Sequence, residues 1–159
     1  QTTLDTSIVA PTDLQRTQEA RNEYGDWQTS YEFACLVCRY LKRQGVTPQI
    51  VIEPTCGKGN FIKAAIAIFD NLEEIYGVEI YKPYLDELKI YTDTLNNVSV
   101  HLFNHDVFTF NFNDIKRQVQ GKNILILGNP SVPKWDIIFL RPLCPPALPF
   151  FLIRIVAGI

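Results

Sequence analysis

The sequence predicts an α/β fold, with an open, mostly parallel sheet and helices on both faces. Three observations support this prediction. Short apolar runs of strand length alternate along the chain with segments whose apolar residues recur at helical spacing. The first strand passes through a glycine turn directly into a helix, as in folds that bind nucleotides at the carboxyl end of a parallel strand. The later strands also end at polar residues.

Composition narrows the class of protein. A chain of 159 residues, 47% hydrophobic and 20% charged, predicts one soluble globular domain with a sizeable core. The net charge of −2 argues against DNA binding by this chain alone, because DNA-binding domains usually carry a basic excess. The four cysteines lack the spacing of a disulfide framework, and no signal peptide is recognisable, so we expect a cytoplasmic protein. Because the first residue is not methionine, we expect a trimmed chain or one that starts inside a longer coding region.

The first part of the chain predicts an arm followed by a helix. Residues 1–22 are polar, and we expect a loose N-terminal arm. An amphipathic helix is predicted over residues 30–43, ending at Gly45. Its apolar residues at helical spacing are Phe33, Leu36, Val37, Tyr40 and Leu41.

The sequence also predicts the N-cap of this helix and the role of its two cysteines. Thr29 or Ser30 is the predicted N-cap, and Glu32 is predicted to complete a capping box with Thr29. Cys35 and Cys38 lie inside the helix, with no further ligands at matching spacing. We therefore expect small core-facing residues rather than a redox or zinc site.

After this helix, predicted strands and helices alternate along the chain. We predict strands over residues 50–52, 74–80, 98–103 and 123–127, helices over 61–69 and 82–95, and a polar, weakly helical segment over 111–121. The unbroken apolar run of the fourth strand suits a fully buried parallel position.

The central stretch reads VIEPTCGKGNF. Gly57 and Gly59 allow close approach of the backbone to a ligand, and the helix start offers unpaired N–H groups. A dinucleotide fingerprint would need glycine in place of Ile62, and a phosphate loop would need Ser or Thr after Lys58. Glu53 would repel a pyrophosphate but tolerates a cationic nucleoside that carries an amino acid. The turn therefore predicts a ligand without phosphates.

Residues 53–61 resemble the first motif of the adenine-N6 DNA methyltransferases of restriction–modification systems, which reads roughly Asp/Glu-Pro-x-Cys-Gly-x-Gly-x-Phe. The resemblance covers roughly Glu23 to Pro130. It implies a Rossmann-like methyltransferase domain over residues 23–130, with S-adenosylmethionine as cofactor. The implied activity is that of an adenine-specific DNA methyltransferase acting on a base flipped out of the duplex.

The resemblance also implies a cofactor site. Tyr24, Gly25 and Thr29 fall on a segment that closes over the methionine end of the cofactor in this family, while Ser30 replaces the usual proline. The residues that the resemblance assigns to the cofactor site are Tyr24, Thr29, Glu53, Pro54, Cys56, Gly57, Gly59, Phe61, Glu79, Ile80, Asp106 and Val107.

Two strand ends carry the nucleoside part of this site. Glu79, at the end of the second strand, can accept hydrogen bonds from both ribose hydroxyls. By resemblance, Ile80 packs on the adenine and Asp106 accepts a hydrogen bond from its amino group. Val107 or Phe108 then forms an apolar wall. His105 has no identifiable partner in the sequence, and we expect a surface histidine.

Asn129 and Pro130 are the predicted catalytic residues. An Asn oxygen and the following backbone carbonyl can each accept one amine hydrogen, which favours the pyramidal nitrogen of the transition state. Asn-Pro after a strand is by itself a common turn, and the resemblance makes it specific. The family motif continues with a second proline and an aromatic residue, which Ser131 and Val132 replace here, and Trp135 comes three residues too late.

From residue 131 to 159 an apolar, proline-rich tail departs from the family. Its prolines, with Arg141 and Arg154, argue against a membrane-spanning helix, and residues 150–156 predict one buried strand. The chain is too short for the remaining strands and a recognition region. We therefore expect a truncated or frame-disrupted methyltransferase with an incomplete sheet, normal up to about Pro130.

Alternatives remain open. One is a catalytically inactive cofactor-binding fragment or interaction subunit, which the damaged motif and the missing basic excess favour. Another is methylation of RNA or of a protein glutamine, because Asn-Pro-Pro-Tyr motifs serve those substrates as well. We expect no metal and no membrane, and a DNA partner would need recognition elements absent from this chain.

Overall fold

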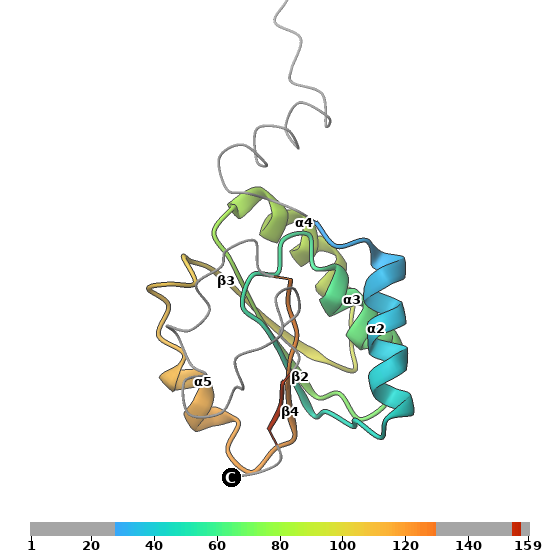
Figure 1. Cartoon of the computed structure of the whole chain (residues 1–159). Helices are drawn as coiled ribbons and strands as arrows, with labels where there is room; N and C mark the ends of the chain where they lie inside the picture. The colour runs from blue at the N-terminus through green and yellow to red at the C-terminus, as the bar shows by residue number, and fades with distance from the viewer. Residues whose placement is uncertain (1–27, 130–153, 157–159) are drawn as a thin grey trace, which may run out of the picture.

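The computed structural model describes residues 28–129 and 154–156 (Figure 1). In chain order the elements are α2 (Tyr31–Arg43), β1 (Ile50–Glu53), α3 (Asn60–Ile68), β2 (Glu74–Glu79), α4 (Lys82–Thr92), β3 (Ser99–Asn104), α5 (Asn113–Gln118), β4 (Ile124–Ile126) and β5 (Arg154–Val156). The predicted alternation is confirmed, and the boundaries differ by a few residues.

The strands form one sheet in the order β3-β2-β1-β4-β5. Neighbouring strands from β3 to β4 are parallel, and β5 pairs antiparallel with β4. The register pairs Glu53 with Gly77 and Glu79 with Asn104, so the carboxyl ends of the parallel strands lie at one edge. The predicted open, mostly parallel α/β sheet is confirmed.

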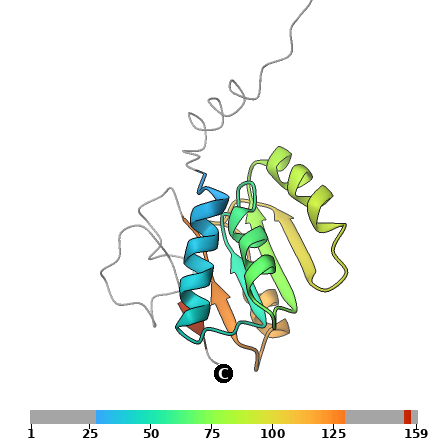
Figure 2. The ribbon, with the colours of Figure 1, turned by 90° about the vertical axis from the view of Figure 1, so that its right-hand side faces the viewer.

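Helices cover both faces of the sheet. Figure 2 shows α2, α3 and α4 side by side on one face, while α5 lies behind the sheet. Val51, Ile75 and Leu125 point into the core under the first three helices. Ile50 and Ile52 point into a second core that includes α5. Burial on both sides explains why these strands are continuous apolar runs.

Helix α2 begins with Ser30 as its N-cap, and the Ser30 hydroxyl accepts the Phe33 N–H at 3.3 Å. The predicted capping box between Thr29 and Glu32 is wrong. The cap lies one residue later, and Thr29 Oγ1 accepts a hydrogen bond from Asn129 instead.

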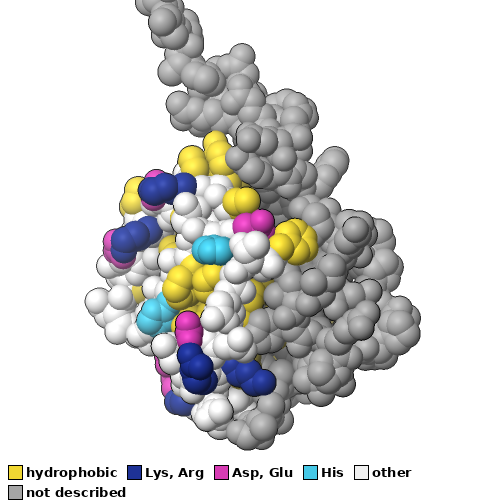
Figure 3. All heavy atoms as spheres, turned by 90° about the vertical axis from the view of Figure 1, so that its left-hand side faces the viewer, with side chains coloured by type: hydrophobic (Ala, Val, Ile, Leu, Met, Phe, Trp, Pro, Cys, Tyr) yellow, Lys and Arg dark blue, Asp and Glu magenta, His cyan; other side chains and the backbone are white. Residues whose placement is uncertain are grey.

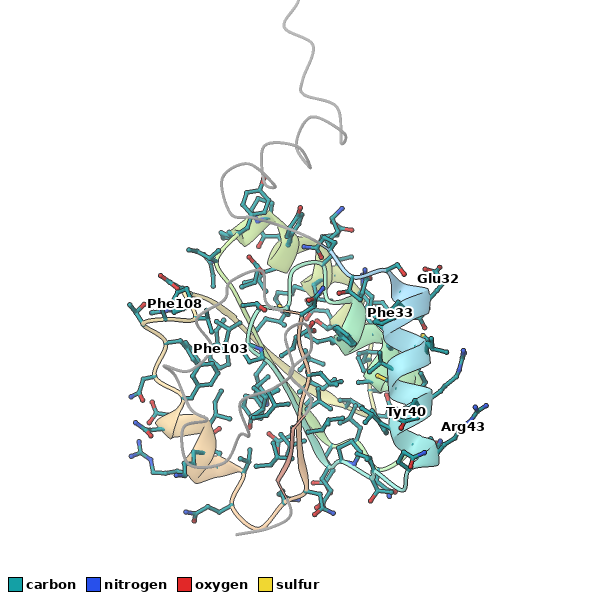
Figure 4. All side chains as sticks on the ribbon, viewed as in Figure 1. Glu32, Phe33, Tyr40, Arg43, Phe103 and Phe108 are labelled. Carbon is teal, nitrogen blue, oxygen red and sulfur yellow. The ribbon has the colours of Figure 1, made fainter. Side chains whose placement is uncertain are left out.

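The buried side of α2 consists of three small residues and Leu41. Ala34, Cys35 and Cys38 belong to the core that includes α3. Their short side chains let the two helices pack closely, and the prediction of core-facing cysteines is confirmed. Phe33 and Tyr40, labelled in Figure 4, are 39% and 61% exposed although both are large and apolar.

Strand β4 is less buried than predicted. Leu125 is fully buried, but Ile124 and Ile126 are only partly buried, so the prediction of a fully buried strand is wrong for one face. Among the described residues, the short helix α5 and its flanking residues Val107, Phe112 and Val119 pack on that face. Strand β5 confirms the predicted strand over residues 150–156 for its last three residues.

Several predictions fall outside the described residues. These are the N-terminal arm over residues 1–22, the cofactor residue Tyr24, the catalytic residue Pro130, and the tail over 131–159 apart from β5. No helix within residues 28–129 is long and apolar enough to cross a membrane.

Candidate functional site

A cleft with a volume of about 230 Å³ opens at the carboxyl edge of the sheet, where β1 to β4 end. Residues far apart in the sequence meet there. The predicted site residues that line the cleft are Thr29, Glu53, Pro54, Cys56, Gly57, Phe61, Glu79, Ile80, Asp106, Val107 and Asn129.

The glycine turn after β1 forms the floor of the cleft. Gly57 and Gly59 have φ angles of 51° and 72°, a left-handed conformation that favours glycine. The Gly57 N–H donates to Glu79 Oε2 at 2.8 Å, and the Lys58 N–H donates to Gln28 Oε1 at 3.1 Å. A phosphate would have to displace these acceptors and lie beside a carboxylate. The turn therefore suits a ligand without phosphates, as the sequence predicts.

Gly59 is not among the residues lining the cleft. It starts α3, and a Cβ at this position would lie 2.5 Å from the Leu88 methyl carbons of α4. Such a distance is far below van der Waals contact. Gly59 therefore allows the turn to pack directly against α4.

Glu53 ends β1 and is 3% exposed. Burial raises the pKa of its carboxyl well above the usual value; a hydrogen bond from the Ile62 backbone lowers it, and the Glu79 charge raises it further. Ile62 lies in the first turn of α3, whose N-cap Gly59 makes no side-chain capping hydrogen bond. The second oxygen of Glu53, Oε2, is buried with no hydrogen-bond partner among the described residues.

Glu79 ends β2 and connects two backbone segments. Oε2 accepts the Gly57 N–H, and Oε1 accepts the Tyr81 N–H at 2.8 Å. The carboxylate is therefore fixed in orientation at the wall of the cleft. A carboxylate offers about four acceptor sites in all, so a fixed carboxylate can bind ligand hydroxyls as well.

Residues that come after β3 form another part of the cleft wall. Asp106 Oδ1 accepts the Phe108 N–H at 2.9 Å and so forms a tight turn. Ile80 and Phe108 line the cleft, and each is 47% exposed. Figure 3 shows apolar side chains gathered around the two histidines on this side of the molecule. Exposed apolar side chains at the wall of a cleft suit a flat ligand ring.

Asn129 follows β4 and is partly buried. Its Nδ2 donates to Thr29 Oγ1 at 3.1 Å, while Asn60 Nδ2 donates to the Thr29 carbonyl at 2.7 Å. Thr29 thus joins the end of β4 to the start of α3.

Cys56 lies in the cleft but is 3% exposed. Burial raises the pKa of its thiol well above the usual value, and the nearby Glu53 and Glu79 charges raise it further. A thiol that stays protonated is a poor nucleophile, so Cys56 contributes shape rather than chemistry. Within the described part of the chain, no group of three His, Cys, Asp or Glu residues could hold a metal.

Sequence reasoning missed several lining residues, namely Gln28, Thr55, Asn60, Val78, Tyr81 and Tyr84. Two signals could have found some of them. Asn60 is the first residue of the helix that follows the glycine turn. Tyr81 and Tyr84 form an edge-to-face ring pair, with centroids 4.8 Å apart, directly after Glu79. His105, predicted as a surface residue, is exposed and also borders the cleft.

The open sheet, the glycine turn after β1 and the cleft at the strand ends are those of a Rossmann-like nucleotide-binding fold. The chain is homologous to a type II methyltransferase, M.NspV of Nostoc sp., with 40% identity over 116 residues. The match covers 73% of this chain and 24% of the relative, so the chain spans about a quarter of that relative's length. The resemblance drawn from residues 53–61 is confirmed at the level of a methyltransferase.

No family model matches the sequence. Two solved structures are similar in fold. A protein proposed to be an RNA methyltransferase, from Pyrococcus horikoshii, has a TM-score of 0.49 and 19% identity, over 69% of this chain and 50% of that one. A modification subunit proposed for a type I restriction enzyme of Vibrio vulnificus has a TM-score of 0.48 and 18% identity, over 72% and 26%. Neither likeness bears on the activity of this chain.

Proposed function

We propose that residues 23–130 form the cofactor and amine sites of a methyltransferase that transfers a methyl group from S-adenosylmethionine to adenine N6 in DNA. One observation carries the proposal: the ends of β1 to β4 bring Glu53, Glu79, Asp106 and Asn129 to one cleft. The 40% identity to a type II methyltransferase supports methyl transfer.

The residues present fit S-adenosylmethionine. The fixed Glu79 carboxylate suits the ribose hydroxyls, and Asp106 suits the adenine amino group, with Ile80 and Phe108 available to the ring. The buried Oε2 of Glu53 has no hydrogen-bond partner among the described residues, so it is available for a hydrogen bond with the ligand. When bound, this cofactor supplies an electrophilic methyl group. The other residues that we assign to its site are Tyr24, Thr29, Pro54, Cys56, Gly57, Gly59, Phe61 and Val107.

Asn129 supplies the chemistry at the amine. The exocyclic amine of adenine is a poor nucleophile because its lone pair is delocalised into the ring. Asn129 Oδ1 accepts one amine hydrogen, and the Pro130 carbonyl is the proposed second acceptor. Both bonds favour a pyramidal nitrogen, so they stabilise the transition state more than the ground state.

A DNA adenine can reach these acceptors only when it leaves the base stack, so a flipped-out base is part of the proposal. The net charge of −2 gives the chain no overall basic excess for holding the duplex. The rival function is a cofactor-binding module without catalysis, which the replacement of the family's second proline and aromatic residue by Ser131 and Val132 favours.

A calorimetric titration with S-adenosylmethionine tests the cofactor site first. We expect saturable binding that Glu79→Ala weakens and Glu87→Ala leaves unchanged, because Glu87 is exposed and does not line the cleft. Absence of binding by a chain that circular dichroism shows to be folded would contradict both the proposal and its rival.

A methylation assay then distinguishes the proposed methyltransferase activity from the rival function. Mixed-sequence DNA is incubated with the chain and radiolabelled S-adenosylmethionine, and its nucleosides are separated. Label in N6-methyldeoxyadenosine supports the proposal. Binding without any labelled nucleoside favours the rival.

A further inference from the structure

Thr29 is the point at which the two halves of the cleft meet. Its hydroxyl accepts a hydrogen bond from Asn129 Nδ2 at 3.1 Å, and its carbonyl accepts one from Asn60 Nδ2 at 2.7 Å. Asn60 begins α3 directly after the glycine turn, whereas Asn129 follows β4. The contact with Asn129 joins residues that are 100 positions apart in the sequence.

This contact determines which way the Asn129 carboxamide faces. An Asn side chain ends in an oxygen acceptor on one side and an NH₂ donor on the other. With Nδ2 directed at Thr29, the oxygen Oδ1 is directed away from Thr29. The reacting amine donates a hydrogen bond, so it needs the oxygen as acceptor. A carboxamide turned over would present its NH₂ donor to the donor of the amine.

We propose that Thr29 is a positioning residue for methyl transfer, whose hydroxyl holds the Asn129 carboxamide with Oδ1 presented to the reacting amine. The inference rests on the proposed role of Asn129. It adds a second task to Thr29, which the sequence assigns to the cofactor alone.

Thr29 is itself held by the cofactor half of the cleft. Asn60 fixes its carbonyl, and the neighbouring Gln28 accepts the Lys58 N–H at 3.1 Å. The glycine turn and the start of α3 therefore set the position of the hydroxyl that orients Asn129. A hydroxyl can accept one hydrogen bond and donate another, and chained bonds strengthen each other. A cofactor group that accepts the Thr29 hydrogen would thus tighten the bond to Asn129.

The first test removes the hydroxyl and keeps the shape. At saturating cofactor, we expect Thr29→Val to lower kcat at least about tenfold, with the KM for DNA changed less than about twofold, because only the alignment of the acceptor is lost. Thr29→Ser should recover activity to within about threefold of wild type. Thr94→Val is the matched control, since the Thr94 hydroxyl bonds a helix carbonyl outside the cleft.

The second test observes the carboxamide directly. In a ¹⁵N-labelled chain, the Asn129 side-chain NH₂ signals are identified by their loss in Asn129→Asp. We expect one of the two protons to exchange slowly with solvent in wild type and in Thr29→Ser. In Thr29→Val that protection should be lost. If Thr29→Val fails to fold, Thr29→Ala removes the same hydroxyl without adding an apolar branch.

The two tests separate failure of this inference from failure of the proposed function. A wild-type chain that binds cofactor but never methylates would refute the proposed activity, and the exchange measurement alone would then decide the contact. Unchanged exchange in Thr29→Val overturns the positioning role. So does an unchanged kcat in an active Thr29→Val chain, or a Thr29→Ser chain as impaired as Thr29→Val.

Discussion

Glu79 and Gly57 are joined by a hydrogen bond of 2.8 Å from the Gly57 backbone N–H to Glu79 Oε2. The two residues belong to neighbouring strand ends, since β1 and β2 pair in parallel. The other oxygen of Glu79 holds the Tyr81 N–H just before α4. One carboxylate therefore fixes the turn after β1, the entry to α4 and one wall of the cleft.

Glu79→Gln should therefore weaken both ligand binding and the fold. The amide keeps one acceptor oxygen and turns an NH₂ group towards a backbone N–H. We expect at least a tenfold loss of affinity for S-adenosylmethionine in calorimetry. The free energy of unfolding in urea should fall by about 1–3 kcal/mol, the usual range for hydrogen bonds to charged groups. The exposed Glu87→Gln is the control, and equal behaviour of the two variants would contradict the assignment.

Asn129→Ala should separate binding from transfer. Loss of the carboxamide removes an acceptor that acts mainly where charge develops, so we expect a loss of transfer of about 100-fold or more. The affinity for S-adenosylmethionine should stay within about threefold, because the proposed role of Asn129 is at the amine and not at the cofactor. Transfer and titration are measured on the same preparation. Unchanged transfer would refute the role of Asn129.

The stability of the chain should depend on pH through Glu53. Burial raises the pKa of this carboxyl in the folded state well above the ordinary value of 4.5, so the folded chain keeps a proton that the unfolded chain has released. Its contribution to stability is therefore complete below pH 4.5 and is lost as the pH rises towards the folded pKa.

Glu53→Gln removes this titration and keeps an oxygen for the Ile62 N–H. The free energy of unfolding of the variant minus that of wild type should rise with pH above 4.5, by at most about 1.4 kcal/mol per pH unit. Urea titrations across the acid-to-neutral range measure this difference. A difference that stays constant with pH would show that Glu53 ionises in the folded chain as easily as in the unfolded one.

Gly59→Ala should cost more stability than Gly121→Ala, although the two glycines have nearly the same φ, 72° and 75°. A Cβ at Gly121 meets nothing within 4 Å, whereas at Gly59 it would lie 2.5 Å from Leu88. We expect a loss of about 1 kcal/mol at Gly121 from backbone strain alone. At Gly59 we expect about 1–3 kcal/mol more from overpacking.

Urea unfolding of both variants tests this difference. In a Leu88→Ala background the extra cost at Gly59 should largely disappear, because the methyl carbons that the new Cβ meets are gone. Equal losses at the two glycines would mean that α4 moves aside without cost.

The features predicted from sequence are those set by local pattern. Apolar runs that end in Glu53, Glu79 and Asn129 identify strand ends, and parallel strands bring their carboxyl ends to one edge. The periodicity therefore sufficed for the sheet and for the location of the cleft. Asp106 came from the family resemblance instead, because an Asp after a strand is by itself a common turn residue.

The features that were missed depend on tertiary packing. Periodicity put Phe33, Leu36 and Tyr40 on the apolar side of α2, yet these side chains are 39%, 61% and 61% exposed. The side that packs against α3 carries Cys35 and Cys38 instead, whose burial was predicted. The bond between Thr29 and Asn129 spans most of the described chain and leaves no trace in local sequence. Asn60 was missed for a similar reason, since a polar residue at a helix start has many possible tasks.

The turn between α4 and β3 lies away from the cleft. Residues 96 and 97 are exposed there, before β3 runs towards the cleft. A cysteine handle or a short inserted tag at this turn would leave the four strand ends untouched. The chain could then be attached to a sensor surface or to a fluorophore while its cleft stays open to the solution. Ligand binding could in this way be followed on single molecules.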